Sequence, residues 1–170
     1  MVDTQRDDRP RIVVGVDGSS SSMEALAWAV RQASLMDGVI DAVIAWEYPQ
    51  FYGSFGWMPP AGQDLRLDAA AAQVIDDTIA RVTGAEPAVD IRSHVEYGTP
   101  ARVLLAAAEG ASLLVLGNRG HGGFAEALLG SVGQHCTQHS PCPIVIVRGQ
   151  DHSAETVPSA ADHRRPARDR

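Results

Sequence analysis

The chain has 170 residues, of which 45% are hydrophobic and 21% are charged, and its formal charge is −7 at pH 7. This length suits one ordinary domain, and the composition is that of a globular protein with a real core. All 14 basic residues are arginine, which excludes a Walker-type phosphate lysine, Schiff-base chemistry and a lysine general base, while the negative charge argues against a duplex nucleic-acid binder.

The two ends of the chain have the composition of solvated tails. Residues 1–10 are polar and end in a proline, and residues 149–170 offer few candidates for a core. The N-terminus lacks the apolar segment of a secretory signal, and no window is long and apolar enough for a membrane helix. Two cysteines are too few for a disulfide framework. We therefore expect a cytoplasmic protein with one domain over residues 11–148 between two disordered tails, and no membrane partner.

Between the tails, apolar runs typical of buried strands alternate with helical periodicity. In chain order the predicted elements are a strand at 11–17, a helix at 18–36, a strand at 38–48, a helix at 64–83, an edge strand at 88–98, a helix at 99–110, a strand at 111–117, a helix around 131–140 and a strand at 142–148. This order predicts an α/β fold, with a five-stranded parallel sheet covered by helices on both faces. Ligands of such sheets bind beyond the carboxyl ends of the strands.

The stretch GNRGHGGFAEALLGS, residues 117–131, holds five of the chain's 16 glycines and follows the fourth predicted strand. Glycine there can adopt positive φ and lets a ligand approach the main chain. Gly130 and Ser131 open the next helix, whose N-terminal N–H groups form a potential phosphate site. The Ser131 hydroxyl could cap this helix or bond to a phosphate oxygen. Bare main chain can thus replace the missing lysine.

The spacing Gly117-x-x-Gly120, nine residues, then Gly130-Ser131 resembles the nucleotide-binding signature of the universal stress protein family. The likeness extends from RIVVGVDGSSSSMEALAWA at residues 11–29 to HSPCPIVIVR at residues 139–148. It implies a three-layer α/β/α fold of the adenine-nucleotide alpha-hydrolase-like type, with strand order 3-2-1-4-5. It also implies a homodimer formed through the fifth strand, from Pro143 to Arg148, and ATP bound at the strand edge.

The resemblance also implies roles for individual residues. The glycines and the serine hydroxyl would hold the ribose and phosphates, whereas the acid that ends the first strand would lie near adenine and ribose. The adenine slot would be lined from the first, second and fourth strands, with either Val43 or Ala45 supplying a main-chain position. The expected ATP-binding residues are Gly15, Asp17, Val43, Leu116, Gly117, Arg119, Gly120, Gly130, Ser131 and Val132.

Several of these residues have other interpretations. Asp17 could end the first strand and cap the helix that follows. It could also help to hold Mg²⁺, although a single carboxylate supplies few ligands for a metal. Arg119 is the only cation in the phosphate region and could screen the terminal phosphate or face solvent. His121, in the same loop, has only Glu126 nearby to orient it as a catalytic base.

Two other stretches invite functional interpretations. His135, Cys136, His139 and Cys142 suggest zinc, but helix geometry points Cys136 about 100° away from the histidines, so core or surface placement is favoured. The aromatic residues between Tyr48 and Trp57 lie in a loop after the second strand. That loop could be a lid over a ligand, but a self-packed or dimer-contact loop is slightly favoured.

The sequence therefore predicts a dimeric ATP-binding regulator or sensor of the stress-response type, with ATP, with or without Mg²⁺, as its ligand. No positioned general base is evident, so binding without efficient catalysis is expected. A slow ATPase, a cyclic-AMP-binding protein and a nucleotide-free interaction module that uses its last strand remain alternatives.

Overall fold

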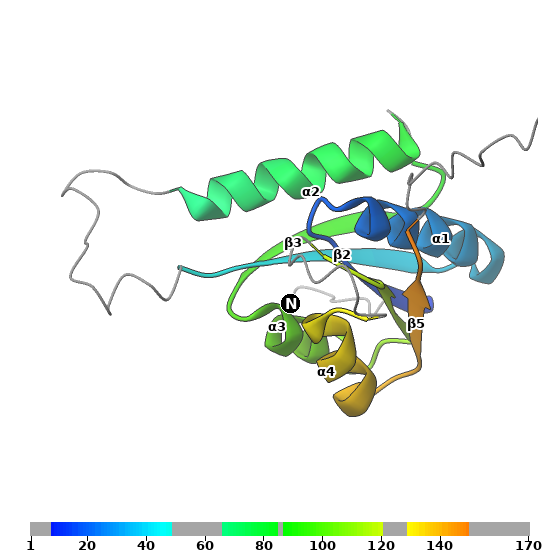
Figure 1. The fold of residues 1–170 in the computed structure, drawn as a ribbon. Coiled ribbons are helices and arrows are strands. Elements are labelled where there is room, and N and C mark those ends of the chain that lie inside the picture. The colour runs from blue at the N-terminus through cyan, green and yellow to red at the C-terminus, as the bar shows by residue number, and fades with distance from the viewer. Residues whose placement is uncertain (1–7, 49–65, 85–86, 121–128, 150–170) are drawn as a thin grey trace, which may run out of the picture.

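The computed structural model describes residues 8–48, 66–84, 87–120 and 129–149. These residues form five strands and four helices that alternate along the chain (Figure 1). They are β1 (Arg11–Gly15), α1 (Ser20–Met36), β2 (Val39–Trp46), α2 (Leu67–Thr83), β3 (Ile91–Tyr97), α3 (Pro100–Ala107), β4 (Leu113–Gly117), α4 (Ser131–His139) and β5 (Ile144–Val147). The elements match the predicted series, and the differences lie at their ends.

The strands pair in parallel in the order β3-β2-β1-β4-β5, which confirms the predicted fold class and strand order. Successive strands run outward from β1 to β3, and the chain then crosses back to place β4 on the other side of β1. The winding direction therefore reverses between β1 and β4. Such a reversal leaves a crevice at the carboxyl ends of these two strands.

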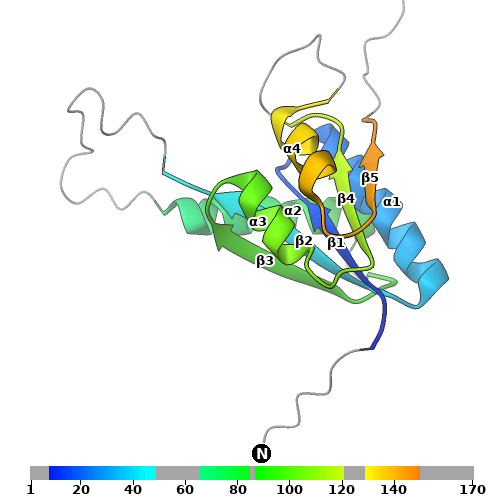
Figure 2. The ribbon, with the colours of Figure 1, turned by 90° about the horizontal axis from the view of Figure 1, so that it is seen from below.

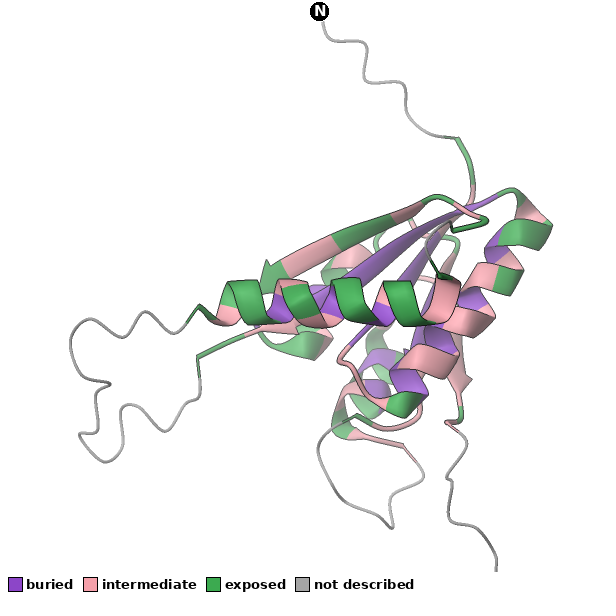
Figure 3. Ribbon diagram, turned by 90° about the horizontal axis from the view of Figure 1, so that it is seen from above, coloured by how far each residue is buried: buried purple, intermediate pink, exposed green. Residues whose placement is uncertain are grey.

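Helices cover both faces of the sheet. Helices α1 and α2 lie on one face and α3 and α4 on the other (Figures 1 and 2). Alternating strand residues supply the two cores: Ile12 and Val14 face α1 and α2, whereas Val13 and Leu114 face α3 and α4. The helices bury only their inner stripe, as the exposed outer side of α2 shows in Figure 3. None of the helices in the described ranges is both long and apolar enough to cross a lipid bilayer.

Local chemistry explains where α1 begins and ends. The Ser19 side chain caps the helix by accepting a hydrogen bond from the Ser22 N–H, which satisfies one of the free donors of the first turn. The helix ends at Asp37, which adopts the left-handed conformation with φ 52°. Helix α3, in contrast, ends at Ala107 rather than at the predicted Gly110, because residues 108–110 form a turn after it.

A partly buried ionic network joins β1, β2 and β3 to the end of α3. Asp41, in the middle of β2, is only 7% exposed. Its Oδ2 accepts a hydrogen bond from Arg11 at 2.9 Å, and its Oδ1 lies 3.2 Å from Nε2 of His94. Arg11 also donates to the carbonyl oxygens of Ala107 and Glu109 at the end of α3. Arg11 therefore stabilises the packing of α3 against the sheet, because it donates hydrogen bonds to carbonyl oxygens at the end of the helix.

Candidate functional site

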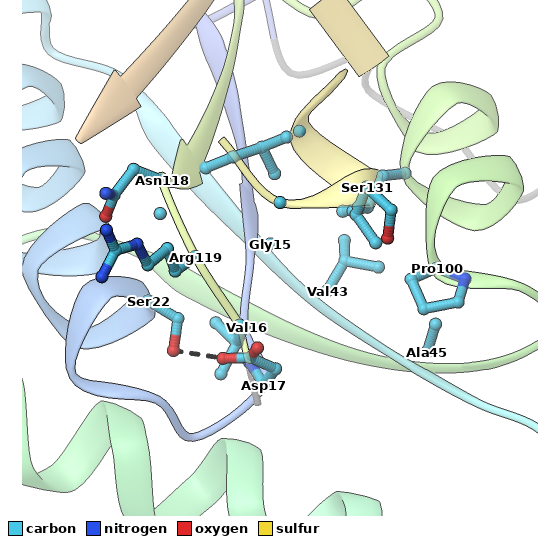
Figure 4. A pocket seen from close by; sticks show the side chains of 17 residues that line it. Gly15, Val16, Asp17, Ser22, Val43, Ala45, Pro100, Asn118, Arg119 and Ser131 are labelled. Carbon is cyan, nitrogen blue, oxygen red and sulfur yellow. Dashed lines mark hydrogen bonds between the residues drawn. The ribbon is translucent and has the colours of Figure 1, made fainter. Parts of the chain in front are cut away.

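A pocket of about 210 Å³ lies at the carboxyl ends of β1 and β4, where the winding reverses (Figure 4). It is bounded by the ends of three strands, the loop after β4 and the first turn of α4. All ten residues predicted from the sequence line it: Gly15, Asp17, Val43, Leu116, Gly117, Arg119, Gly120, Gly130, Ser131 and Val132. The fold therefore brings together residues that are up to 117 positions apart in the chain.

The inner end of the pocket is an apolar slot between strand ends. A Cβ on Gly15 would lie 2.6 Å from Cδ2 of Leu116 and 3.3 Å from the side chain of Leu104. The bare backbone at Gly15 therefore makes room for these two leucines. Val43 forms another wall of the slot. A flat apolar group, such as a nucleobase, suits a slot of this composition.

The main chain of β2 is open toward this slot. Strand β1 pairs with β2 only as far as Gly15, opposite Val43, and the Val43 carbonyl accepts the Val16 N–H at 2.9 Å. Because alternate residues of a strand face the same neighbour, the next β2 residue directed to that side is Ala45. Among the described residues, no strand pairs with Ala45 on that side, so its N–H and C=O are directed to where a ligand could contact them. The sequence left Val43 and Ala45 as alternatives for this main-chain role, and Ala45 has the free groups.

Two glycines, Gly117 at the end of β4 and Gly120 in the loop after it, lie close to other parts of the protein. A Cβ on Gly117 would lie 2.6 to 2.8 Å from Oγ, C and O of Ser21, in the first turn of α1. A Cβ on Gly120 would lie 2.5 Å from Oδ2 of Asp17. Neither glycine has a positive φ, so the expected conformational reason does not apply to them. Close approach of the α1 main chain explains Gly117, whereas the atom close to Gly120 is the end of the flexible Asp17 side chain.

Gly130 has a different environment. The nearest atoms to a Cβ placed there are Cα of Arg119 and the carbonyl oxygen of Asn118, both at 3.8 Å. No described part of the protein needs that space, which opens between α4 and the loop. Gly130 is the N-cap of α4, and it makes no side-chain cap. The Ser131 hydroxyl therefore does not cap the helix, which removes one of the two roles expected for it.

The first turn of α4 presents hydrogen-bond donors to the pocket. The Gln134 N–H makes the first intrahelical bond, to the Gly130 carbonyl at 2.9 Å. The N–H groups of Ser131, Val132 and Gly133 precede that bond, so they have no partner within the helix. All three residues line the pocket. These three amides, which have no partner within the helix, and the positive end of the helix dipole attract an anion.

The contacts of Asp17 bear on two of the roles expected for it, as a helix cap and as a nucleotide contact. Its Oδ1 accepts the Ser19 N–H at 2.9 Å, which holds the turn before α1, but the helix cap is Ser19 itself. Its other oxygen faces Gly120, and the residue lines the pocket. In the view of Figure 4, the Arg119 side chain extends beside that of Asn118 and away from Ser131. Asp17 and Arg119 are the charged residues among the described pocket lining.

Asn118 holds the loop in place, although it was not among the site residues expected from the sequence. Its N–H donates to the Val147 carbonyl, its carbonyl accepts the Gly130 N–H, and its Oδ1 accepts the Gly149 N–H at 3.2 Å. One residue thus joins the ends of β4 and β5 to the start of α4. The sequence feature that could have identified Asn118 is its position directly after a buried strand and beside a glycine predicted to bind the ligand. Five further lining residues were not expected from the sequence: Val16, Ser22, Pro100, Leu104 and Gly133.

The other candidate residues lie elsewhere or outside the described ranges. His135 and His139 stack with ring centroids 4.4 Å apart, and Nδ1 of His139 donates to the His135 carbonyl. Cys136 is buried in the core below α4, and this burial raises the pKa of its thiol. Within the described ranges no three side chains of the metal-ligating types gather into a possible metal site. His121 and most of the aromatic loop after β2 lie outside the described residues.

Comparison with known proteins gives one family. The sequence model of the universal stress protein family matches residues 9–148. A universal stress protein of Mycobacterium tuberculosis is 36% identical over 143 residues, which cover 81% of this chain and 44% of that protein. One of Methanocaldococcus jannaschii is 27% identical over 142 residues, covering 81% of each chain. The chain thus spans less than half the length of the mycobacterial relatives it matches.

Solved structures share the fold. A universal stress protein in complex with cAMP is 27% identical, with a TM-score of 0.57, over 83% of this chain and 98% of that one. A universal stress family protein of Arabidopsis thaliana with AMP bound has a TM-score of 0.53 at 17% identity, over 89% of this chain and 97% of that one. The second likeness, at such low identity, concerns the fold alone.

Proposed function

Because the chain belongs to the universal stress protein family, we propose that it binds ATP in the pocket between β1 and β4 and acts as a nucleotide-dependent regulator. The observation that carries this proposal is the pocket itself. An apolar slot with an open main-chain edge lies at one end, and three amides of α4 that have no partner within the helix lie at the other. These two ends suit the base and the phosphates of one nucleotide.

The slot supports adenine as the base. The free N–H and C=O of Ala45 form a donor and an acceptor side by side on the β2 edge. Adenine presents a ring-nitrogen acceptor next to an exocyclic amino donor, and guanine presents the reverse order. The main chain of Ala45 therefore favours adenine over guanine. The complex of a related protein with cAMP is consistent with an adenine ligand.

The α4 end of the pocket favours ATP over cyclic AMP. A cyclic monophosphate offers one phosphate group, whereas a polyphosphate can reach Arg119 as well as the amides of the α4 first turn. Mg²⁺, where present, would be held by the nucleotide's own phosphates, because Asp17 is the one carboxylate among the described lining residues. Cyclic AMP remains the second candidate, on the evidence of the related complex.

We expect binding without efficient hydrolysis. Asp17 already accepts the Ser19 N–H and lies against Gly120, so it is not aimed at a water beyond the terminal phosphate as a general base must be. Phosphate release measured with ATP and Mg²⁺ should stay near the background of buffer alone. Release well above background that disappears in Gly130→Ala would make the protein an ATPase instead.

The free edge of β5 supports a homodimer. All four residues of β5 are apolar and only partly buried in the single chain. A short apolar edge strand of this kind is a site for pairing with another chain.

Mass spectrometry of the small molecule released on denaturation tests the nucleotide assignment. The protein purified without added nucleotide should release ATP or its breakdown product ADP. Release of cyclic AMP would replace the proposed ligand, whereas release of no adenine compound together with no binding of added ATP would contradict the proposal.

A further inference from the structure

Ser21, the second residue of α1, touches the glycine loop although it does not line the pocket. It is only 4% exposed. Its hydroxyl donates a hydrogen bond to the main-chain carbonyl of Arg119. Its main chain also closes against Gly117, where a Cβ would meet Ser21 atoms at 2.6 to 2.8 Å. Helix α1 is therefore held directly against the loop that follows β4.

Gly149 brings a third segment to the same residue. A Cβ at Gly149 would lie 3.0 to 3.2 Å from Cα, Cβ and N of Ser21. The Gly149 N–H is held by the side chain of Asn118. Ser21 thus packs between the end of β4 and the second residue after β5, and this packing leaves its side chain little freedom to move away from Arg119.

The bond from Ser21 fixes one peptide plane of the loop. A trans peptide is planar, so its N–H points away from its C=O. With the Arg119 carbonyl directed at Ser21 in α1, the Gly120 N–H is directed to the opposite side. The Gly120 nitrogen lies 4.0 Å from the Cβ position of Gly130, which places it across from the start of α4. The Gly120 N–H therefore faces the same space as the open amides of α4.

This peptide would otherwise turn over easily. Gly120 has no Cβ, so it accepts the dihedral changes of a peptide flip at little steric cost. A flip would direct the Arg119 carbonyl oxygen, instead of the Gly120 N–H, into a space that a phosphate would occupy. An oxygen there would repel the anion.

We infer that Ser21 is a positioning residue for the phosphate part of the site: its hydroxyl holds the 119–120 peptide so that the Gly120 N–H serves as a phosphate donor. This inference rests on the proposed nucleotide function. It predicts an effect confined to the phosphates, because the apolar slot for the base is built from other residues, Gly15, Val43 and Leu116.

Calorimetry with ATP and with adenosine tests the inference in the wild type and in Ser21→Ala. Loss of one hydrogen bond of ordinary strength should weaken ATP binding about three- to tenfold, while the dissociation constant of adenosine stays within about twofold. Ser34→Ala is the matched control. Ser34 is on the same helix and its hydroxyl donates to the Val30 carbonyl at 3.0 Å, but it is remote from the pocket, so both ligands should bind as to the wild type.

An ATP affinity that is unchanged in Ser21→Ala, or that falls by the same factor as adenosine affinity, would overturn the inference while leaving the proposed function intact. A wild type that binds adenosine but gains nothing from the phosphates would overturn both. Alanine favours helix, so α1 should form in the variant. If Ser21→Ala does not fold, Ser21→Cys provides the same comparison with a weaker donor.

Discussion

Substitution by alanine should have different effects at the two glycines Gly130 and Gly117 of the candidate site. Gly130→Ala places its Cβ between α4 and the loop, with the nearest protein atoms at 3.8 Å, an ordinary contact distance. The backbone at Gly130, with φ −69° and ψ 163°, suits alanine. Gly117→Ala places its Cβ 2.6 to 2.8 Å from three atoms of Ser21, two of which belong to the main chain. The first substitution therefore fits the fold and the second does not.

The two substitutions should differ in free energy of unfolding. An alanine N-cap costs up to about 1 kcal/mol relative to glycine, and the lower entropy of the unfolded chain offsets about 0.4–1 kcal/mol of this. Gly130→Ala should then change stability by less than about 1 kcal/mol. Gly117→Ala must move main-chain atoms of α1 or β4, and overpacking of this kind costs about 1–3 kcal/mol. Its effect on ATP binding would therefore be mixed with a loss of stability.

For ligand binding, Gly130→Ala should give the clearer result, because its effect is not mixed with a loss of stability. The methyl group of Gly130→Ala occupies space next to the Gly120 N–H and the α4 amides. It should weaken ATP binding at least about tenfold, or about 1.4 kcal/mol, and leave adenosine binding unchanged. Urea unfolding and calorimetry on the same samples measure both effects. Wild-type ATP affinity in Gly130→Ala would refute the placement of the phosphates, and wild-type stability in Gly117→Ala would refute the packing argument.

The remaining predictions concern the rest of the fold. Asp41→Asn removes the charge that faces Arg11 in a partly buried pair, so the free energy of unfolding measured with urea should fall by about 1–3 kcal/mol, with ATP affinity unchanged; a fall below about 0.5 kcal/mol would contradict the network. Ile146→Pro removes an outward N–H of β5, since Pro143 and Val147 face β4; gel filtration should find a monomer, and an intact dimer would rule out this interface. Burial raises the pKa of Cys136 above its usual value, so little thiolate exists at pH 8; a thiol reagent should modify Cys142 first, and equal rates would contradict this burial.

The strand and helix order was predictable because each element has its own periodicity. Continuous apolar runs such as IVV in β1 are typical of a strand buried on both faces. The strand order came from the family resemblance, because periodicity does not say which parallel strands are neighbours. The ends of elements were less predictable. Gly110 was expected to end α3, but the helix stops three residues earlier because a turn follows it.

The site residues were predictable as a group, but their individual reasons were not. Gly117, Gly120 and Gly130 share one motif, yet Gly117 packs against the main chain of Ser21, Gly120 lies beside the Asp17 carboxylate, and Gly130 faces space that no described residue fills. Such contacts join residues about 100 positions apart, as between Gly117 and Ser21, so the local sequence pattern does not predict them. For the same reason, Asp41 was counted among the residues of an apolar strand, and its pairing with Arg11 emerged only from the fold.

We propose that main-chain amides at the start of α4 and at Gly120 hold a polyphosphate without any lysine. Calorimetric titration of the wild type with ATP, AMP and adenosine measures what these amides provide. We expect one ATP per chain and an affinity that rises from adenosine to AMP to ATP, because each phosphate adds contacts with these amides or with Arg119. Equal affinities for the three ligands, or no heat with millimolar ATP, would show that the amides do not hold the phosphates.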